Sequence, residues 1–296
     1  MAVNEPGREP HRTAELRLTR GGPPAYHDAY TRAHFDLAIV AIIPARFGST
    51  RLPGKPLSDI HGRPMIQWVY ECVRRARRVD RILVATDHAR IAEAVARFGG
   101  EAVMTSAAHA TGTDRLAEAA GRLDADIVVN VQGDEPMLDP ALVDAVVEPL
   151  LEDDSLPMST VSLPLRRPEE MLSASVVKVV ADARGRALYF SRSPIPVVRD
   201  GGPPDLREAA LRAVSAGLAR KHVGLYAHRR EALLRIAALP PAPLEVAEGL
   251  EQLRALHHGL AIQVVPCEGE SGRAVDTPED LEAVRDLLKI HANTVR

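Results

Sequence analysis

Cysteine, aromatic residues and long apolar runs are all scarce in this chain. Its 296 residues include two cysteines, Cys72 and Cys267, which make no disulfide framework and have no metal-site spacing. Aromatic residues are 3% of the chain, which argues against the base-stacking surfaces of nucleic-acid binders. No apolar run approaches the length of a membrane span, and an apolar secretory core is lacking. We therefore expect a cytoplasmic protein with no membrane partner.

The chain also has no large excess of positive or negative charge. Lys and Arg number 37 and Asp and Glu number 40, a net charge of -3 that argues against general nucleic-acid binding. The length exceeds what one small core needs, so we expect one large α/β domain, or a large domain with a smaller lobe. Residues 1–36 are rich in Pro, Gly, Arg and Glu without apolar periodicity, which predicts a disordered tail before a domain at 37–296.

A basic loop follows the first apolar run. Residues 37–43 are continuous and β-branched, as in a strand buried on both faces. Arg46, Arg51 and Lys55 then fall within ten positions, among glycines that allow close approach of a ligand. Such a loop at the carboxyl end of a parallel strand predicts a polyphosphate site. On composition alone, a solvated surface turn is an equal alternative.

The order of elements predicts the fold class. Up to residue 136 the pattern alternates strand and helix, which indicates a doubly wound, mostly parallel sheet. Asp87 is expected to cap the helix that follows its strand. From about 157 to 227 short strands follow with little helix, which predicts an inserted, smaller antiparallel lobe. The Pro/Gly-rich residues 199–207 are expected to be mobile, and a helix is expected from Leu244 through Leu256.

Two acidic positions are candidates for a metal site. Asp134 follows a buried strand and precedes Glu135-Pro136, and carboxylates with substrate phosphates are what Mg²⁺ commonly binds. An acidic turn is an equal alternative there. Asp276 precedes a helix start in which Thr277 caps and Pro278 stands at the first helical position. Asp276 could therefore also be no more than the residue before a cap.

Three stretches together carry a resemblance. They read IPARFGSTRLPGKP at 43–56, NVQGDEP at 130–136 and VDTPED at 275–280. In this order they resemble the 3-deoxy-manno-octulosonate cytidylyltransferases, or CMP-Kdo synthetases, and the likeness covers about residues 38–286. CMP-sialate synthetases share the Pro-Ala-Arg loop but typically lack the Thr-Arg-Leu-Pro-Gly-Lys-Pro continuation.

The resemblance implies a nucleotidyltransferase fold and a reaction. CTP and the eight-carbon acidic sugar 3-deoxy-D-manno-octulosonate (Kdo) would give CMP-Kdo, a precursor of lipopolysaccharide, and pyrophosphate. The family requires Mg²⁺, and its members are usually homodimers built through the smaller lobe. Two alternatives stay open: a cytidylyltransferase for a related 2-keto-3-deoxy sugar acid, such as amino-Kdo or sialic acid, and a non-catalytic CTP-binding homologue.

The resemblance also implies roles for individual residues. Arg46, Lys55 and Asp134 match catalytic positions, and Asp134 and Asp276 match magnesium ligands. The positions matching CTP-binding residues are Ala45, Arg46, Arg51, Lys55, Thr86, His109, Thr111, Gly112 and Thr113. The positions matching sugar-binding residues are Gln132, Arg192, His222 and Glu245. Taken alone, His222 would more often be a hydrogen-bonded structural histidine, and Arg192 could form an interface salt bridge.

Two positions depart from the family pattern, and we expect the first to have little effect. The family loop His-x-Ser-Gly-Thr here carries Thr111 in place of serine, which keeps the hydroxyl. Val197 stands where the family often has an aromatic residue. The second departure lies on the sugar side and leaves the exact sugar acid open.

Overall fold

The computed structural model describes residues 37–49, 51–109, 111–199, 205–269 and 272–294. The fold below is that of the unit that begins at Leu37. The predicted tail at 1–36 lies outside the described residues, as does 200–204, the centre of the segment expected to be mobile.

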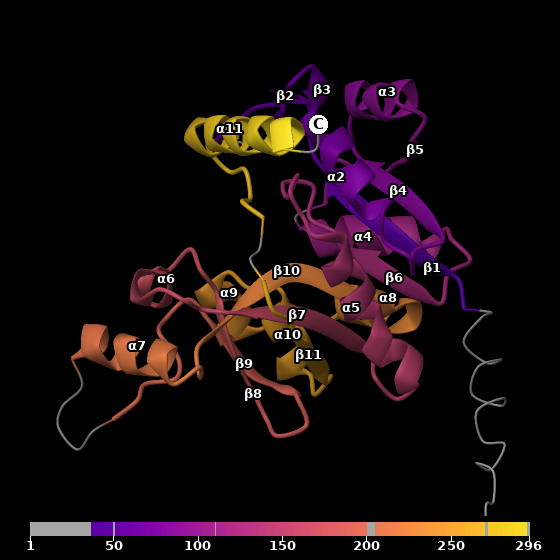
Figure 1. Ribbon diagram of the computed structural model, residues 1–296. Helices are drawn as coiled ribbons and strands as arrows, with labels where there is room; N and C mark the ends of the chain where they lie inside the picture. Colours follow the sequence, from indigo (N-terminus) through magenta and orange to yellow (C-terminus); the bar gives the residue numbers. More distant parts are fainter. Residues whose placement is uncertain (1–36, 50, 110, 200–204, 270–271, 295–296) are drawn as a thin grey trace, which may run out of the picture. The chain divides into compact units, whose positions relative to one another are not determined.

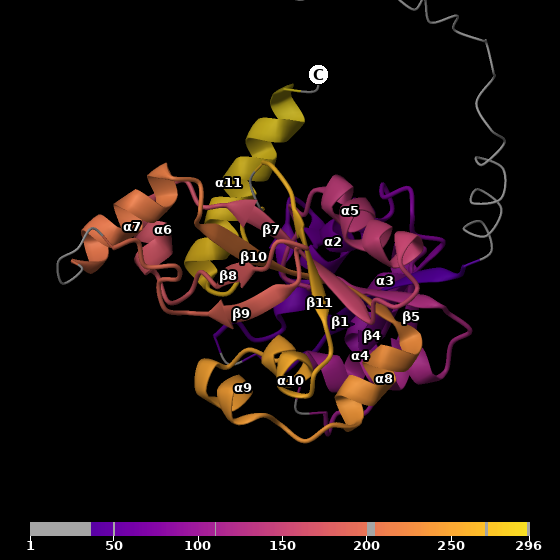
Figure 2. The same cartoon turned by 90° about the horizontal axis from the view of Figure 1, so that it is seen from below.

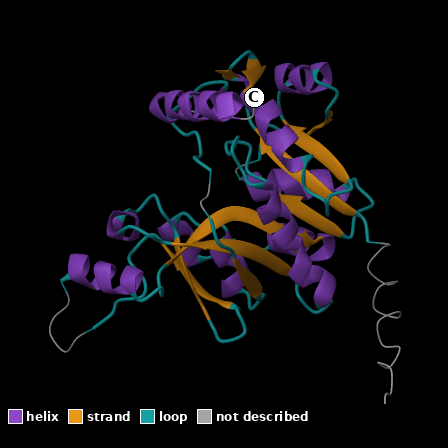
Figure 3. Ribbon diagram, in the orientation of Figure 1, coloured by secondary structure: helices purple, strands orange, loops and turns teal. Residues whose placement is uncertain are grey.

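The centre of this unit is a mixed sheet (Figures 1 and 3). Its strand order is β11-β7-β10-β6-β1-β4-β5, and the β8–β9 hairpin joins beside β10. Neighbours are parallel from β6 to β5 and between β11 and β7, while β10 runs antiparallel to β6 and β7. The strands are β1 (Ile39–Ala45), β4 (Arg81–Thr86), β5 (Glu101–Met104), β6 (Ile127–Asn130), β7 (Met158–Pro164), β8 (Lys178–Ala181), β9 (Ala187–Ser191), β10 (Arg220–Arg229) and β11 (Ile262–Pro266), with β2 (Asp59–Ile60) and β3 (Arg63–Pro64) in a separate small sheet.

Helices cover both faces of the sheet. In the described residues they are the 3-10 turn η1 (Lys55–Leu57), α2 (Met65–Val73), α3 (Ala89–Arg97), α4 (Gly112–Gly121), α5 (Pro140–Glu152), α6 (Pro168–Leu172), α7 (Leu206–Ser215), α8 (Arg230–Ala238), α9 (Pro243–Glu248), α10 (Gln252–His257) and α11 (Pro278–Thr294). Apolar side chains of α2 and α5 pack on one face, and those of α4 and α8 pack on the other. In Figure 2, α9 and α10 lie next to α8 on the side of the sheet that α4 covers.

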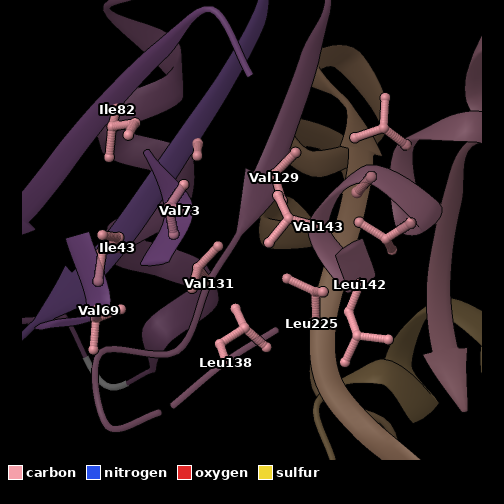
Figure 4. Close-up of a cluster of buried hydrophobic side chains, with 14 of the residues drawn as sticks. Ile43, Val69, Val73, Ile82, Val129, Val131, Leu138, Leu142, Val143 and Leu225 are labelled. Atoms are coloured by element: carbon pink, nitrogen blue, oxygen red, sulfur yellow. The ribbon is translucent and has the colours of Figure 1, made fainter. Parts of the chain in front are cut away.

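Strand β1 shows why the sheet is buried on both faces. Ile43 points into the larger core, which contains side chains of α2 and α5 (Figure 4). Its neighbour Ile42 points into the core beneath α4 and α8. Because successive side chains of a strand point to opposite faces, a continuous apolar run is what a doubly covered strand requires. The predicted α/β class, with a mostly parallel sheet and a smaller antiparallel part, is confirmed.

The segment expected to form the smaller lobe is distributed over the molecule. Strands β7 and β10 lie within the central sheet and the β8–β9 hairpin joins it beside β10, whereas α6 and α7 lie beyond the sheet (Figure 1). A hairpin turn at 182–185 joins β8 to β9, with the Asp182 carboxylate accepting from the backbone N–H groups of Arg184 and Arg186. The boundary at about 157 and 227 stays a prediction.

Two local expectations are wrong. Asp87 does not cap α3; His88 does, through Nδ1, which accepts from the Arg90 backbone at 3.2 Å. The Asp87 carboxylate instead pairs with the Arg115 guanidinium at 2.9 Å. A hydrogen bond between two charged groups is stronger than one from a carboxylate to a backbone N–H at the helix start. The helix expected from 244 to 256 is two short helices, because Gly249 has a positive φ of 61° and ends α9.

The C-terminal helix returns to the start of the domain. Leu281 and Val284 of α11 pack against Ile60 and Met65. This packing brings the segment before α11 beside the loop that follows β1. The structure contains, among its described helices, none with the length and apolar character needed to cross a membrane.

Candidate active site

A cavity of about 1020 Å³ opens beside the carboxyl ends of β1 and β6. Its walls come from parts of the chain that are far apart in sequence. They include the loop after β1, the loop before α4, the loop after β6, strand β10, the start of α10 and the segment before α11. In open α/β sheets ligands bind at this edge, so the cavity is the candidate active site.

The basic loop after β1 is held by local contacts. Phe47 stacks on His88 with ring centroids 4.0 Å apart, and the Arg90 guanidinium carbon lies 5.3 Å from the centroid of the Phe47 ring. The Phe47 backbone N–H donates to Asp87 at 3.3 Å, and Gly54, with φ of 67°, caps η1. The left-handed turn at Gly54 aims Lys55 toward the cavity, and a side chain at position 54 would be strained there.

Lys55 joins two carboxylates from distant parts of the chain. Its Nζ donates to Asp134 Oδ2 at 2.7 Å and to Asp276 Oδ1 at 3.2 Å. It also donates to the Val275 carbonyl at 3.0 Å. Arg51 lies 3.2 Å from the same Asp276 oxygen. The two predicted metal ligands are therefore brought together around one cation, at the mouth of the cavity.

Close backbone packing makes this meeting possible. A Cβ at Gly133 would lie 2.8 Å from the Pro44 carbonyl, so only glycine allows the loop after β6 to lie against the end of β1. A Cβ at Gly272 would lie 2.5 Å from the Met137 carbonyl. The Val275 N–H donates to the Asp134 carbonyl at 2.9 Å. These contacts fix the Asp276 segment beside Asp134.

Arg46 lies at the cavity. Its side chain is exposed and lines the cavity, and within the described residues no carboxylate pairs with it. Groups able to hold a metal by themselves, with three or more His, Cys, Asp or Glu, do not occur in the described part of the chain. A cation at Asp134 and Asp276 would thus need ligands from substrate or water, as Mg²⁺ sites commonly do.

The predicted nucleotide loop forms the start of α4. Thr111 caps the helix by accepting from the Asp114 N–H, and Asp114 accepts in return from the Thr111 N–H. His109 Nε2 contacts the Glu118 carboxylate. Thr111, Gly112 and His109 line the cavity, where free N–H groups of a helix start favour anionic or acceptor groups.

Thr113 links this loop to the opposite wall. Its backbone N–H and hydroxyl both donate to the Glu251 carboxylate, just before α10. Ala45, Arg51 and Lys55 also line the cavity, as predicted CTP-binding residues should. Thr86 does not line it; the side chain is buried and accepts from the His88 N–H at 3.3 Å.

The predicted sugar residues divide into two groups. Gln132, Arg192 and His222 line the cavity. Glu245 does not, because its buried carboxylate pairs with Arg254 at 2.6 Å and accepts from the Ala242 N–H. This pair explains the lowered pKa of Glu245, which burial alone would raise. Its sugar-binding role stays a prediction that this geometry does not favour.

Arg192 and His222 both make hydrogen bonds within the protein. The Arg192 guanidinium donates to the carbonyls of Glu248, Ala174 and Gly249. His222 Nε2 lies 3.0 Å from the Thr160 hydroxyl. That hydroxyl donates to the Leu225 carbonyl at 2.8 Å, so His222 Nε2 carries the proton and Nδ1 is the acceptor. Burial lowers the pKa of His222 to about 3, which keeps the ring neutral.

Sequence reasoning missed several residues of the inner wall. Asn130, Tyr226, His228 and Gln252 line the cavity, and Glu135 joins them near the mouth. The signal for β10 was present, because His222, Tyr226 and His228 stand at even spacing in one strand and therefore share a face. Burial lowers the pKa of His228 to about 4. Burial and the adjacent Asp134 raise the pKa of Glu135 to about 8.

Comparison with known proteins agrees with this geometry. A family model described as cytidylyltransferase matches residues 40–262. A 3-deoxy-manno-octulosonate cytidylyltransferase of Geobacter sulfurreducens is 54% identical over 251 residues, which are 85% of this chain and 99% of the relative. A protein of the same name from Trichlorobacter lovleyi is 54% identical over 253 residues, with 86% and 99% covered.

Solved structures show the same likeness. A CMP:2-keto-3-deoxy-manno-octonic acid synthetase complexed with CTP superposes with a TM-score of 0.77 at 43% identity, covering 86% of this chain and 99% of that chain. The 4-diphosphocytidyl-2C-methyl-D-erythritol synthase of Anaerococcus prevotii superposes with a TM-score of 0.55 at 16% identity, covering 87% and 99%, which shows a shared fold alone.

Proposed function

The chain belongs to the family of 3-deoxy-manno-octulosonate cytidylyltransferases, and on that premise we propose that it transfers CMP from CTP to Kdo. The anomeric hydroxyl oxygen of the sugar attacks the α-phosphorus of CTP, and a new P–O bond forms. The bond between the α-phosphorus and its bridging oxygen breaks, and pyrophosphate leaves. The hydroxyl proton is released, so the products are CMP-Kdo, pyrophosphate and a proton.

One observation carries this proposal. Lys55, Asp134 and Asp276 meet at the mouth of a cavity that Arg46 and Arg51 also line. Cations at this place neutralise the triphosphate and the charge that develops on the departing pyrophosphate, and fixed charges of this kind supply most of the rate in phosphoryl-type transfer. We assign Arg46 and Lys55 to the α-phosphate and the leaving group, and Arg51 to the triphosphate beside them.

We further propose that Asp134 and Asp276 hold Mg²⁺. The donor set fits this ion, because two carboxylate oxygens already lie within hydrogen-bond distance of one cationic nitrogen, Lys55 Nζ. When bound, Mg²⁺ would supply Lewis acidity toward the phosphate and a lower pKa for the attacking hydroxyl. Lys55 would then be released from the carboxylates to the phosphate oxygens.

The two substrates are proposed to occupy opposite walls. The loop at 109–113 and the start of α4 face the nucleoside with backbone N–H groups and hydroxyls. Gln132, Arg192 and His222 face the sugar. Three of the five Arg192 N–H groups donate to backbone carbonyls, so two stay available for the sugar's carboxylate.

The proposal extends to assembly and location. We propose a homodimer built through the part of the molecule around α7, where apolar side chains are exposed. These are Leu172, Leu188, Val197, Leu206, Leu211 and Leu218. We place the enzyme in the cytoplasm, where CTP is available.

The test is pyrophosphate release from purified protein with CTP, Mg²⁺ and Kdo. Release must depend on all three components, and UTP, ATP and GTP serve as comparison nucleotides. Sialic acid and amino-Kdo are measured side by side with Kdo. Release no greater than in a no-sugar control for every acceptor would refute the proposal, and faster release with sialic acid would reassign the sugar.

A further inference from the structure

One face of α4 holds the loop that connects β5 to the nucleotide wall of the cavity. Arg115, Glu118 and the C-cap residue Arg122 follow at helical spacing, so their side chains share this face. The Arg115 guanidinium donates to the Thr105 hydroxyl at 2.5 Å, and that of Arg122 donates to the Met104 carbonyl at 2.8 Å. The side chain of Glu118, which stands between the two arginines on the helix, contacts the part of the loop nearest the cavity.

The Glu118 carboxylate accepts hydrogen bonds from two positions of this loop. The Ser106 N–H donates to Oε2 at 2.8 Å, and His109 Nε2 contacts the same oxygen. The other oxygen, Oε1, pairs with Arg122. The hydrogen bonds from the Ser106 backbone and the His109 ring lower the pKa of Glu118, so that its side chain is ionised near pH 7. An ionised carboxylate only accepts hydrogen bonds, and His109 Nε2 therefore carries the proton in this contact.

The contact with Glu118 decides which nitrogen of His109 a ligand can meet. A neutral imidazole that donates through Nε2 accepts through Nδ1, so Nδ1 is the atom left for a ligand. His109 lines the cavity and its side chain is 22% exposed. Glu118 does not line the cavity. Its effect on a bound ligand is therefore exerted through His109 and the loop that it holds.

The nucleoside part of CTP carries the donors that such an acceptor requires. The 4-amino group of cytosine and the hydroxyls of ribose donate hydrogen bonds, whereas the triphosphate oxygens accept them. The cations that suit the triphosphate, Arg51 and Lys55, both contact Asp276 at the mouth of the cavity. An acceptor at His109 Nδ1 is therefore matched to the nucleoside and not to the phosphates.

We infer that Glu118 is a positioning residue for nucleoside recognition, which holds His109 so that Nδ1 accepts a hydrogen bond from the cytosine amino group or from a ribose hydroxyl. The inference rests on the proposed function, because it takes the nucleotide to be CTP. In carboxylate–histidine pairs the carboxylate fixes the tautomer and the orientation of the ring, and the ring contacts the ligand. Without Glu118 the ring can rotate, and Nδ1 is no longer directed at one group of the nucleoside.

Binding of four nucleotides tests the inference. Calorimetric Kd values are measured with Mg²⁺ for CTP, UTP, 2′-deoxy-CTP and 3′-deoxy-CTP. We expect Glu118→Ala to reduce the wild-type preference for CTP over one of the other three by about fivefold or more, the effect of one such hydrogen bond. A change with UTP identifies the cytosine amino group as the donor, and a change with a deoxynucleotide identifies the missing hydroxyl. Glu118→Gln, whose amide oxygen can still accept from His109 Nε2, should retain part of the preference.

A double-mutant cycle separates positioning from a structural role. In the His109→Ala background, Glu118→Ala should change the same preference by less than about twofold, because the ring that Glu118 holds is missing. Glu152→Ala, at an exposed carboxylate of α5 that does not line the cavity, is the control and should bind as wild type does. If Glu118→Ala does not fold, Glu118→Met, which keeps the length of the side chain, takes its place. Equal weakening of all four nucleotides, or effects of the two substitutions that multiply, would overturn the inference, since general loosening of the loop gives that result.

The binding measurements also separate this inference from the proposed function, because they need no turnover. If wild type binds CTP but releases no pyrophosphate with any sugar acid, the proposed function fails, and the Kd values alone decide the inference. If pyrophosphate is released but the nucleotide preferences of wild type and Glu118→Ala are the same, the inference fails and the proposed function stands. Wild type that binds no CTP would refute the inference, because the ligand of His109 would be absent.

Discussion

Lys55 contacts two carboxylates that lie 79 and 221 residues further along the chain. Its side chain is 16% exposed, and those of Asp134 and Asp276 are 27% and 44% exposed. The Lys55–Asp134 pair is mostly buried, and the cost of removing its two charges from water offsets much of their attraction, so its net contribution to stability is small. The arrangement is better understood as a binding site, in which Lys55 exchanges the two carboxylates for phosphate oxygens when the substrate binds.

The Asp134→Asn variant tests this understanding. Asparagine keeps the size and removes the charge, so we expect Tm to stay within about 3 °C while kcat/KM falls about 10²- to 10³-fold. The measurement is pyrophosphate release over a range of Mg²⁺ concentrations, together with thermal unfolding. Asp154→Asn, at a 93% exposed carboxylate that does not line the cavity, is the matched control and should not change turnover. Near wild-type turnover with unchanged Mg²⁺ dependence in Asp134→Asn would contradict the assignment.

Two neutral histidines make stability depend on pH. The folded-state pKa values of His222 and His228 are about 3 and about 4, below the ordinary value of 6.5. Between those values and 6.5 the unfolded chain binds more protons than the folded one, so stability falls as pH falls through that window. At pH 5.5 each histidine is expected to cost about 1.4 kcal/mol of unfolding free energy.

Urea unfolding at pH 7.5, 6.5 and 5.5 measures this loss. His228→Gln removes one titrating group, so its unfolding free energy should depend less steeply on pH than that of wild type. His257→Phe, which removes an exposed histidine, should keep the wild-type slope. If the unfolding free energies of wild type and His228→Gln depend equally on pH, His228 has the same pKa in the folded and the unfolded protein, and the prediction is wrong.

At the scale of elements, the loop after β6 depends on one glycine. Because a Cβ at position 133 would lie 2.8 Å from the Pro44 carbonyl, Gly133→Ala forces β1 and this loop apart. We expect a loss of about 1–3 kcal/mol in unfolding free energy, as for overpacking elsewhere, and a fall in turnover since Asp134 is the next residue. Gly121→Ala, at the end of α4 with no contact closer than 4.0 Å, is the control and should be neutral or slightly stabilising. Denaturant unfolding measures both, and equal stabilities would show that the loop adjusts without cost.

Elements that the sequence predicted well have strong local signals. The strands of residues 39–45, 81–86 and 127–130 are short, continuous apolar runs, because both faces are covered. The sequence could not show that β10 lies between β6 and β7, since strand pairing is set by contacts far apart in the chain. The cap at Asp87 was wrong for the same reason, because Arg115 is 28 residues away. The end of a helix at Gly249 could have been predicted from the sequence, since glycine commonly ends a helix.

Some residues of the candidate site could be predicted from local patterns, and others could not. Lys55 and its loop could be read from charge and glycine spacing. Asp276 could not be distinguished from the residue before a helix cap, and only the resemblance paired it with Asp134. The inner wall around His228 was missed, because alternation along β10 groups His222, Tyr226 and His228 on one face but does not show that this face borders a cavity.

At the scale of the whole molecule, exposed leucines on and beside α7 bear on how the chain assembles. Leu206 and Leu211 of α7 are 54% and 45% exposed, and Leu218 just beyond is 55% exposed. Exposed apolar side chains gathered on neighbouring elements indicate an interaction surface more than scattered ones do. We expect the 32.0 kDa chain to behave in solution as a dimer of about twice that mass.

Leu211→Glu places a charge on this surface without touching the cavity. A buried, unpaired carboxylate at an interface is costly, so we expect the dimer dissociation constant to rise at least tenfold, a change of about 1.4 kcal/mol. Light scattering over a dilution series measures it. Val246→Glu, at a 72% exposed apolar residue of α9, is the matched control and should leave the mass unchanged. If Leu211→Glu is as dimeric as wild type at every concentration, α7 does not form the interface; if wild type is itself monomeric, the exposed leucines require another explanation.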